Sequence, residues 1–317
     1  MGITTTTVLP PPVQQAFDMK LLAREMPYLI HDKFALKRSM SARNGNIMRM
    51  RRYNRLNVTT APLGPSGITP PAQQLSAIDI DAQIQWYGSY VNITDQVTLI
   101  NQDPALNEAA SVLGQCLKET EDALVRNMLQ ATASVINCTN GINADNPTEL
   151  TRQDIDIVTR TLISSNARKI SGVVEGQDKF GTGPVREAFF CMSHSDVIQD
   201  LENVIGFQSV AQYPSQMNIL SAEWGSVANM RFLVSSEGSS VAAASALGAT
   251  LYNNFVVGEE AYACIDLEDA NAEFIYRPLG SGDDPLLQRQ TAGFKFAQAQ
   301  RITNDSWCIN LRSTLGL

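Results

Sequence analysis

Residues 78–86 (IDIDAQIQW) are the stretch from which we predict the fold, because apolar and polar residues alternate along it. A period of two is typical of a strand with one apolar face. The alternation changes phase near Tyr87-Gly88-Ser89, after which Val91 and Ile93 occupy odd positions. A bulge or bend at this glycine is therefore expected. The apolar positions of the strand are Ile78, Ile80, Ala82, Ile84 and Trp86.

Upstream of this strand, the chain predicts a partner strand and a long loop. Residues 47–56 form a basic stretch that favours a strand, and residues 59–75 contain four prolines and two glycines that preclude regular structure. Two strands that flank such a tip form a long ribbon, which is marginal alone in water. We expect it to rest on another subunit through the following candidate contacts: Arg49, Arg51, Arg52, Arg55, Ile78, Ile80, Ile84 and Trp86.

Downstream, Asp103-Pro104 is a strong helix start, and apolar residues then recur on one face for about 27 residues. Residues 17–34 also have helix-like apolar spacing, which Pro27 interrupts. Strands and helices follow without regular alternation, which indicates an α+β fold. The further predicted elements are helices at 151–167 and 196–204, strands at 188–192, 232–235 and 254–257, and two strands around 303–305.

Charge is distributed unevenly along the 317 residues. Of the 24 basic and 32 acidic residues, residues 19–55 hold ten and two, a net charge of +8. The rest of the chain holds 14 and 30, a net charge of −16. The basic segment could lie on acidic surface of a neighbouring copy, face nucleic acid, or form a solvated basic face.

Composition excludes several classes of protein. The chain is 44% hydrophobic, which supports a real core, and it has no apolar run of about 18 residues. The first 12 residues lack the basic start and apolar core of a secretory signal. Five widely spaced cysteines without a CxxC motif favour reduced thiols over a disulfide framework.

Chemical motifs are absent from the sequence: we find no zinc, calcium, phosphate-loop or dinucleotide pattern. The most enzyme-like cluster is Ser193-His194-Ser195-Asp196, where Ser195 also suits a helix N-cap, so we interpret the cluster as structural. Cys191 is interpreted as a buried thiol. Asp79 and Asp81 could bind a cation, although a solvated strand face is the favoured interpretation. Acids at 259–260 and 266–269 are interpreted as solvated loops or as docking sites for the basic segment.

Several segments, in order, resemble the major capsid proteins of tailed phages, in the branch typified by the short-tailed coliphage N-four. Residues 21–34 and 48–53 are similar to the family's start, and the loop LGPSGITP at 63–70 matches its "L-x-E-G-x-T-P" region without the acidic residue. QWYGSYVNITD at 85–95 is similar to "Q-Y-G-x-Y-V-x-I-T-D". Residues 277–286, 293–295 and 305–307 resemble the family's last loop and hairpin, so the match covers most of 20–313.

The resemblance implies the Hong-Kong-97-type fold, in which an N-terminal arm and an extended loop precede a peripheral domain with a spine helix and an axial domain. It implies the following division: an arm at 1–45, the extended-loop ribbon with flanking strands at 46–95, a peripheral domain with spine helix at 96–146, an axial domain at 147–265, and a return to the peripheral domain with a closing hairpin at 266–317.

The resemblance also implies a function without catalysis, cofactor or metal. Copies would form hexamers and pentamers of an icosahedral shell around double-stranded DNA, assembled in the host bacterial cytoplasm and located in the virion. Expected partners are a portal, a separate scaffolding protein and, optionally, a cement or decoration protein; no membrane is involved. The alternatives are an encapsulin-type bacterial compartment, which would hold cargo enzymes, and a hydrolase that uses His194.

Two expectations concern maturation. Only about 16 residues of low complexity precede the first predicted helix, so we expect no large N-terminal cleavage. No lysine lies between Lys37 and Lys118, and no cysteine precedes Cys116. The ribbon therefore lacks the amine or thiol that a covalent link between subunits would need.

Overall fold

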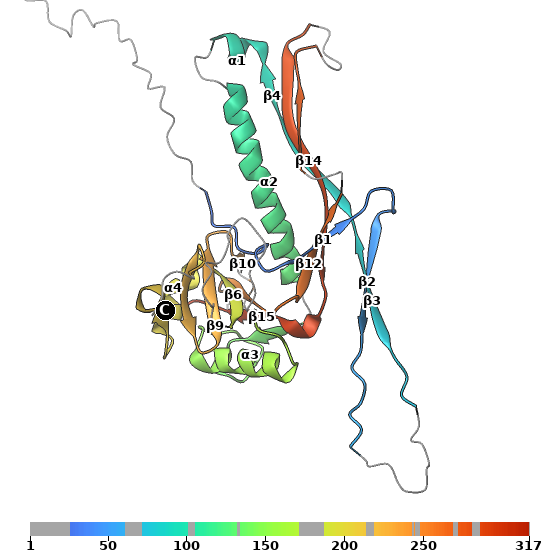
Figure 1. Ribbon diagram of the computed structural model, residues 1–317. Coiled ribbons are helices and arrows are strands. Elements are labelled where there is room, and N and C mark those ends of the chain that lie inside the picture. The colour runs from blue at the N-terminus through green and yellow to red at the C-terminus, as the bar shows by residue number, and fades with distance from the viewer. Residues whose placement is uncertain are drawn as a thin grey trace, which may run out of the picture.

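The computed structural model describes residues 26–60, 72–100, 105–131, 134–170, 187–213, 219–242, 244, 248–268, 272–280 and 286–316. Figure 1 shows an elongated molecule with a compact end, a long helix that runs beside a sheet, and a ribbon that projects from the body. Strands and helices mix without regular alternation, so the predicted α+β class is confirmed.

The compact end is built on an eight-stranded sheet of order β5-β15-β11-β6-β9-β8-β7, with β10 paired to β11. Helix α3 (Arg152–Ser164) packs on one face, where Ile155, Val158 and Leu162 meet Phe189 and Phe232. The strands are β5 (Val135–Asn137), β6 (Phe189–His194), β7 (Gln208–Ser209), β8 (Glu223–Val227), β9 (Met230–Ser235), β10 (Ser239–Val241), β11 (Leu251–Val257) and β15 (Cys308–Ser313).

A five-stranded sheet forms the elongated part. Its central strand β14 (Arg289–Ile302) pairs with β4 (Gln85–Thr94) along one edge and with β12 (Tyr262–Leu267) and β13 (Glu273–Arg277) along the other. Strand β1 (Leu36–Met40) adds to β12 in parallel. This sheet therefore joins two segments from the first third of the chain, 36–40 and 85–94, to segments from its last fifth, 262–302.

Helix α2 (Ala105–Gln130) connects the two sheets, as Figure 1 shows. Near its start, Leu113 and Leu117 pack on Phe294 and Phe296 of β14. Near its end, Val125 and Leu129 join the core on the second face of the eight-stranded sheet, together with Ile30 and Phe34. The predicted helix of about 27 residues is thus confirmed within the described range, and it is preceded by the short α1 (Asp95–Ile100), which was not predicted.

The ribbon consists of β2 (Ile47–Tyr53) and β3 (Ala77–Gln83), in antiparallel register from Ile47–Gln83 to Tyr53–Ala77. Both strands were predicted, but the predicted bend at Tyr87–Ser89 is misplaced. The strand breaks at Ile84, and β4 runs without interruption through Gly88. Ile84 lies at the base of the ribbon, where its side chain is buried against Met40 and Ile265. The strand is therefore interrupted where this residue packs into the core.

Three other expectations need correction. Residues 26–35 form turns and irregular structure where a helix was predicted up to Phe34, and the rest of that segment lies outside the described residues. The two C-terminal strands form, but β14 and β15 belong to different sheets and so make no closing hairpin. The acidic stretch at 266–269 is only partly loop, because Asp266 and Leu267 end β12.

The helices at the compact end agree with the predictions. Thr151 caps α3 through a capping box with Asp154. After β6, the 3₁₀ helix η1 (Ser195–Val197) leads into α4 (Ile198–Asn203). His194 rather than Ser195 is the N-cap, because its Nδ1 accepts from Asp196 N at 3.1 Å. Two short 3₁₀ helices complete the set: η2 (Val210–Gln212) and η3 (Asp305–Trp307).

Candidate assembly surface

Two ion pairs join the strands of the ribbon on one face. Arg49 donates through Nε and Nη2 to Asp81 at 2.7 and 2.9 Å, and Arg51 contacts Asp79 with the same two distances. Each pair lies directly opposite in the strand register and is bidentate, the geometry that suits a guanidinium and a carboxylate. The hydrogen bonds from the arginines lower the pKa of both carboxyls. Asp79 and Asp81 thus lie on an exposed strand face, as favoured from the sequence, and each carboxylate binds an arginine of its own chain.

The residues predicted to contact a neighbour lie in different environments in the structure. Arg49 and Arg51 brace the ribbon internally, whereas Arg52 lies on the other face and its Nη1 donates to Thr303 O at 3.4 Å. Arg55 lies beyond β2 and is exposed. Of the apolar candidates, Ile78 is 41% exposed and Ile80 is half-buried. Ile84 is buried in its own chain, so it is not available to a neighbour.

Toward its tip, the ribbon carries large apolar side chains that the described part of the chain does not cover. Tyr53 at the end of β2 is exposed, and so are Leu56, Val58 and Leu75 beyond the paired strands; Val58 and Leu75 are about 70% exposed. Figure 1 shows the ribbon extending away from both sheets, where no other described element lies beside it. An apolar surface of this kind is typical of a protein–protein contact.

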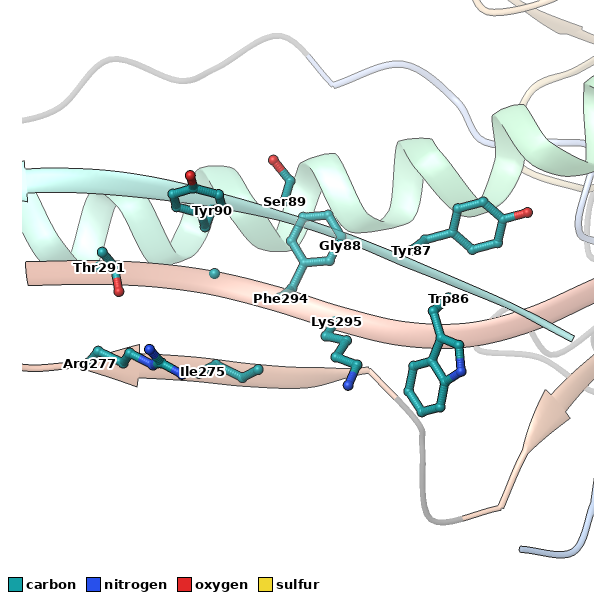
Figure 2. Close-up of a pocket in the computed structure, with 11 residues that line it drawn as sticks. Trp86, Tyr87, Gly88, Ser89, Tyr90, Ile275, Arg277, Thr291, Phe294 and Lys295 are labelled. Carbon is teal, nitrogen blue, oxygen red and sulfur yellow. The ribbon is translucent and has the colours of Figure 1, made fainter. Parts of the chain in front are cut away.

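A shallow hollow of about 540 Å³ lies on the face of the five-stranded sheet that points away from α2. Gly88 of β4 and Gly293 of β14 form its floor, since neither carries a side chain there. Trp86 is on its rim, 56% exposed, with Lys295 Nζ 4.3 Å from its ring centre. Figure 2 shows Trp86 and Lys295 extending to the same side of β14.

The two glycines are required by close backbone contact. A Cβ on Gly88 would lie 2.7 Å from Phe294 O, and a Cβ on Gly293 would lie 2.8 Å from Tyr90 Cβ and 2.9 Å from Ser89 O. These distances are shorter than non-bonded atoms tolerate. The same glycine that was predicted to bend the strand instead allows β4 and β14 to pair closely.

We expect Gly293→Ala to destabilise the protein by about 1–3 kcal/mol, since the methyl group would force the two strands apart. Thermal unfolding followed by circular dichroism would measure this. Gly114→Ala is the matched control, because a Cβ there meets nothing within 4 Å on the exposed side of α2. The control should be stabilised by about 0.5–1 kcal/mol. Equal melting temperatures for the two variants would contradict the close contact.

Comparison with known proteins places this architecture. No family model and no curated protein matches the chain. Solved structures do match over its full length. The capsid of Ralstonia phage GP4 superposes with a TM-score of 0.72 at 11% identity, covering 100% of this chain and 99% of that one.

The chain has the Hong-Kong-97-type capsid fold. Two further capsid structures agree with this assignment. That of Helicobacter pylori bacteriophage KHP30, described as acidic stable, gives a TM-score of 0.68 at 9% identity and covers 99% of both chains. The cyanophage Pam1 capsid gives 0.66 at 13% identity, covering 98% of this chain and 99% of that one.

Within this capsid fold, the cluster at 193–196 is structural. Ser193 is buried, His194 caps η1, and Asp196 Oδ2 accepts from the Tyr252 hydroxyl at 2.9 Å. Cys191 is fully buried as predicted, and burial raises the pKa of its thiol to about 12, so it stays protonated. Among the described residues, no group of three His, Cys, Asp or Glu side chains could hold a metal ion. No helix of the described chain is long and apolar enough to cross a membrane.

The start of the basic segment makes its contacts with its own chain. Strand β1 pairs with β12 of its own chain, which places Ser39 opposite Asp266. Lys37 forms an ion pair with Asp32. The predicted acidic docking site at 266–269 is therefore beside the basic segment of the same chain. Most basic residues from Arg43 to Arg55 lie on strand β2 of the ribbon.

Neither the hollow nor strand β13 was predicted from the sequence. Gly88 was noticed only as a breaker, and its partner Gly293 lies 205 positions away in the sequence. The run Glu273-Phe274-Ile275-Tyr276-Arg277 has strand-forming residues and could have been identified by them.

Proposed function

We propose that the chain is a major capsid protein, whose copies assemble into the icosahedral shell that encloses the double-stranded DNA of a tailed phage. The observation that carries the proposal is a capsid fold whose ribbon exposes Val58 and Leu75 far from its own core. The described part of the chain leaves these side chains exposed, and in the proposed shell a neighbouring subunit covers them. The function is then binding between copies, without a catalytic step.

The geometry supports a division of labour between parts of the chain. Helix α2 and the five-stranded sheet form one rigid unit, because Leu113 and Leu117 pack on Phe294 and Phe296. The Arg–Asp pairs stiffen the ribbon that projects from this unit. We propose that ribbons lie on neighbours within hexamers and pentamers, with contacts from Ile78, Arg52 and Arg55 of the ribbon, and that Trp86 of β4 adds a contact from the sheet.

Further partners follow from such a shell and are part of the proposal. A portal, a separate scaffolding protein and, optionally, a cement protein would act with it, and the shell would enclose DNA without reading its sequence. Assembly would occur in the host cytoplasm. The placement in the branch typified by coliphage N-four rests on sequence motifs such as residues 85–95. The solved phage capsids favour this function over an encapsulin-type compartment.

The direct test is microscopy of the protein, expressed alone and with candidate scaffolding proteins from its source genome. Closed shells or flat sheets of hexamers would support the proposal. In particles from the natural source, a DNA-filled shell supports a phage capsid, and a protein-filled shell supports the compartment. A protein that stays monomeric at every concentration and with every scaffold would refute both.

We expect denatured mature particles to give a single band near 34.6 kDa, because subunits are held by non-covalent contacts. No amine or thiol is available along the ribbon between Lys37 and Cys116. Arginine cannot replace lysine as a nucleophile, since its guanidinium stays protonated. The measurement is a gel of particles boiled in detergent with reducing agent. A ladder of multimers would contradict it.

We expect Arg51→Asp to reduce the yield of shells, because it sets two carboxylates opposite each other in the ribbon. The defect should be largest at low ionic strength, where charge repulsion extends beyond about 10 Å. The control is the exchanged pair Arg51→Asp/Asp79→Arg, which should restore yield. If the exchange does not restore it, Arg51 contacts a neighbour instead of bracing its own ribbon. Light scattering across a salt series measures both variants.

A further inference from the structure

Strand β13 is an exposed edge with no partner on its outer side in the described chain. It pairs with β14 over five residues, from Glu273–Lys295 to Arg277–Thr291. All five of its residues are exposed, including three consecutive large apolar ones, Phe274, Ile275 and Tyr276. Figure 2 shows Ile275 and Arg277 on this strand, which lies across β14 from β4. An apolar strand edge of this kind is a template for another strand.

The sequence of β13 is complementary to itself when read antiparallel. If two copies pair with Ile275 opposite Ile275, then Glu273 lies opposite Arg277 at both ends, and Phe274 lies opposite Tyr276. Opposite charges and aromatic pairs are the cross-strand neighbours that stabilise antiparallel sheets. Neither Glu273 nor Arg277 has an ion-pair partner within the described residues, so both charges are available.

We propose that β13 pairs with β13 of a second copy, antiparallel and about a twofold axis through Ile275, so that the two five-stranded sheets become one continuous sheet. The contact is isologous, because the same patch serves both copies. One face of the new pair carries Ile275 between two Glu273–Arg277 bridges. The other face, which is the face of the sheet on which α2 packs, carries the two Phe274–Tyr276 pairs.

This contact would join two subunits of the proposed shell through named residues. It rests on the proposed function only for its place in a shell. Icosahedral shells contain twofold relations between neighbouring subunits, which an isologous contact needs. Five-residue strands make a weak contact in an isolated pair of molecules. Repeated between many copies of a shell, weak contacts of this kind act together.

Disulfide trapping tests the register. Directly opposite residues of an antiparallel pair have Cα atoms about 4.5–5.5 Å apart, within the range that a disulfide spans. Ile275→Cys should therefore give a cross-linked dimer on mild oxidation, at least tenfold more than Phe274→Cys, which has no cysteine opposite it. The double variant Phe274→Cys/Tyr276→Cys should cross-link again. The unchanged chain controls for Cys116, the one native thiol that is not buried.

A charge exchange tests the same contact without further thiols. Arg277→Glu should reduce the dimer trapped through Ile275→Cys at least tenfold, since it sets two glutamates opposite each other at both ends of the strand pair. Adding Glu273→Arg should restore the cross-link. Equal cross-linking at positions 274 and 275, or no rescue by the exchange, would overturn the proposal.

Microscopy of the same samples separates this inference from the proposed function. If Ile275→Cys forms shells but gives no cross-linked dimer, the β13 contact alone is contradicted. If it gives the cross-linked dimer but forms no shells under any condition, the capsid function alone is contradicted. Circular dichroism of each variant shows that it is folded, so a lost cross-link reports on the contact.

Discussion

A chain without the tip of its ribbon should fold normally and form no shells. The deletion removes residues 54–76 and joins Tyr53 to Ala77 through an Asn-Gly turn. These two residues already face each other in the register, so a two-residue hairpin turn closes the shortened ribbon. The removed residues make their described hydrogen bonds within the ribbon tip, for example Asn57 with Gln73. The body should keep its melting temperature, while the exposed apolar contacts are lost.

Thermal unfolding and electron microscopy together measure this prediction. A second variant keeps the full length of the ribbon and replaces three exposed apolar residues, Leu56, Val58 and Leu75, by serine, so that it tests apolar contact separately from ribbon length. If apolar burial on a neighbour drives assembly, this variant should also fail to form shells. Normal shells from the deletion would show that the ribbon tip has no part in assembly. A large fall in melting temperature would show that it supports its own subunit.

Local patterns of the sequence were sufficient for the elements that carry a strong period. The alternation of 78–86 predicted β3, and the apolar stripe after Pro104 predicted α2 to within a few residues. Both elements have one buried face, so their periodicity records their packing. The capsid fold itself came from motifs in order rather than from periodicity, and the solved capsids confirm it at 8–13% identity.

Other elements could not be predicted because distant contacts determine them. Residues 26–34 have helical spacing, yet Ile30 and Phe34 are buried from a turn that is tied to α2 and β12. The strand break at Ile84 depends on a core shared with Met40 and Ala299. Whether β14 and β15 form a hairpin depends on which sheet each joins, and no local signal records that.

The candidate contacts show the same limit. Arg49 and Arg51 were correctly placed on the ribbon, but only the strand register reveals that Asp81 and Asp79 stand opposite them. The sequence contains that information in principle, since Arg-x-Arg and Asp-x-Asp recur with the same period on two adjacent strands. The hollow over Gly88 and Gly293 needs the pairing of β4 with β14, which sequence alone did not supply.

The segment before β1 is held to helix α2 by one buried carboxylate. Asp122 Oδ1 accepts from the backbone N–H groups of His31 and Asp32, at 2.8 and 3.3 Å. Its Oδ2 lies 2.7 Å from Nδ1 of His31, whose ring is fully buried. A carboxylate only accepts, so Nδ1 carries the proton and donates it. The Tyr262 hydroxyl donates to His31 O and ties the same turn to β12.

Asp122→Ala should therefore cost about 3 kcal/mol of stability, because three donors would lose their acceptor and most of the surrounding site is buried. Denaturant unfolding gives the free energy, and limited proteolysis shows whether residues before Leu36 become accessible first. Lys118→Ala is the control on the same helix. Its ion pair with Glu121 is exposed, and such pairs contribute little, so we expect a change under about 0.5 kcal/mol. Equal losses in the two variants would contradict this anchoring role. A loss confined to Asp122→Ala, with early cleavage before Leu36, would show that the spine helix positions the arm from which the ribbon starts.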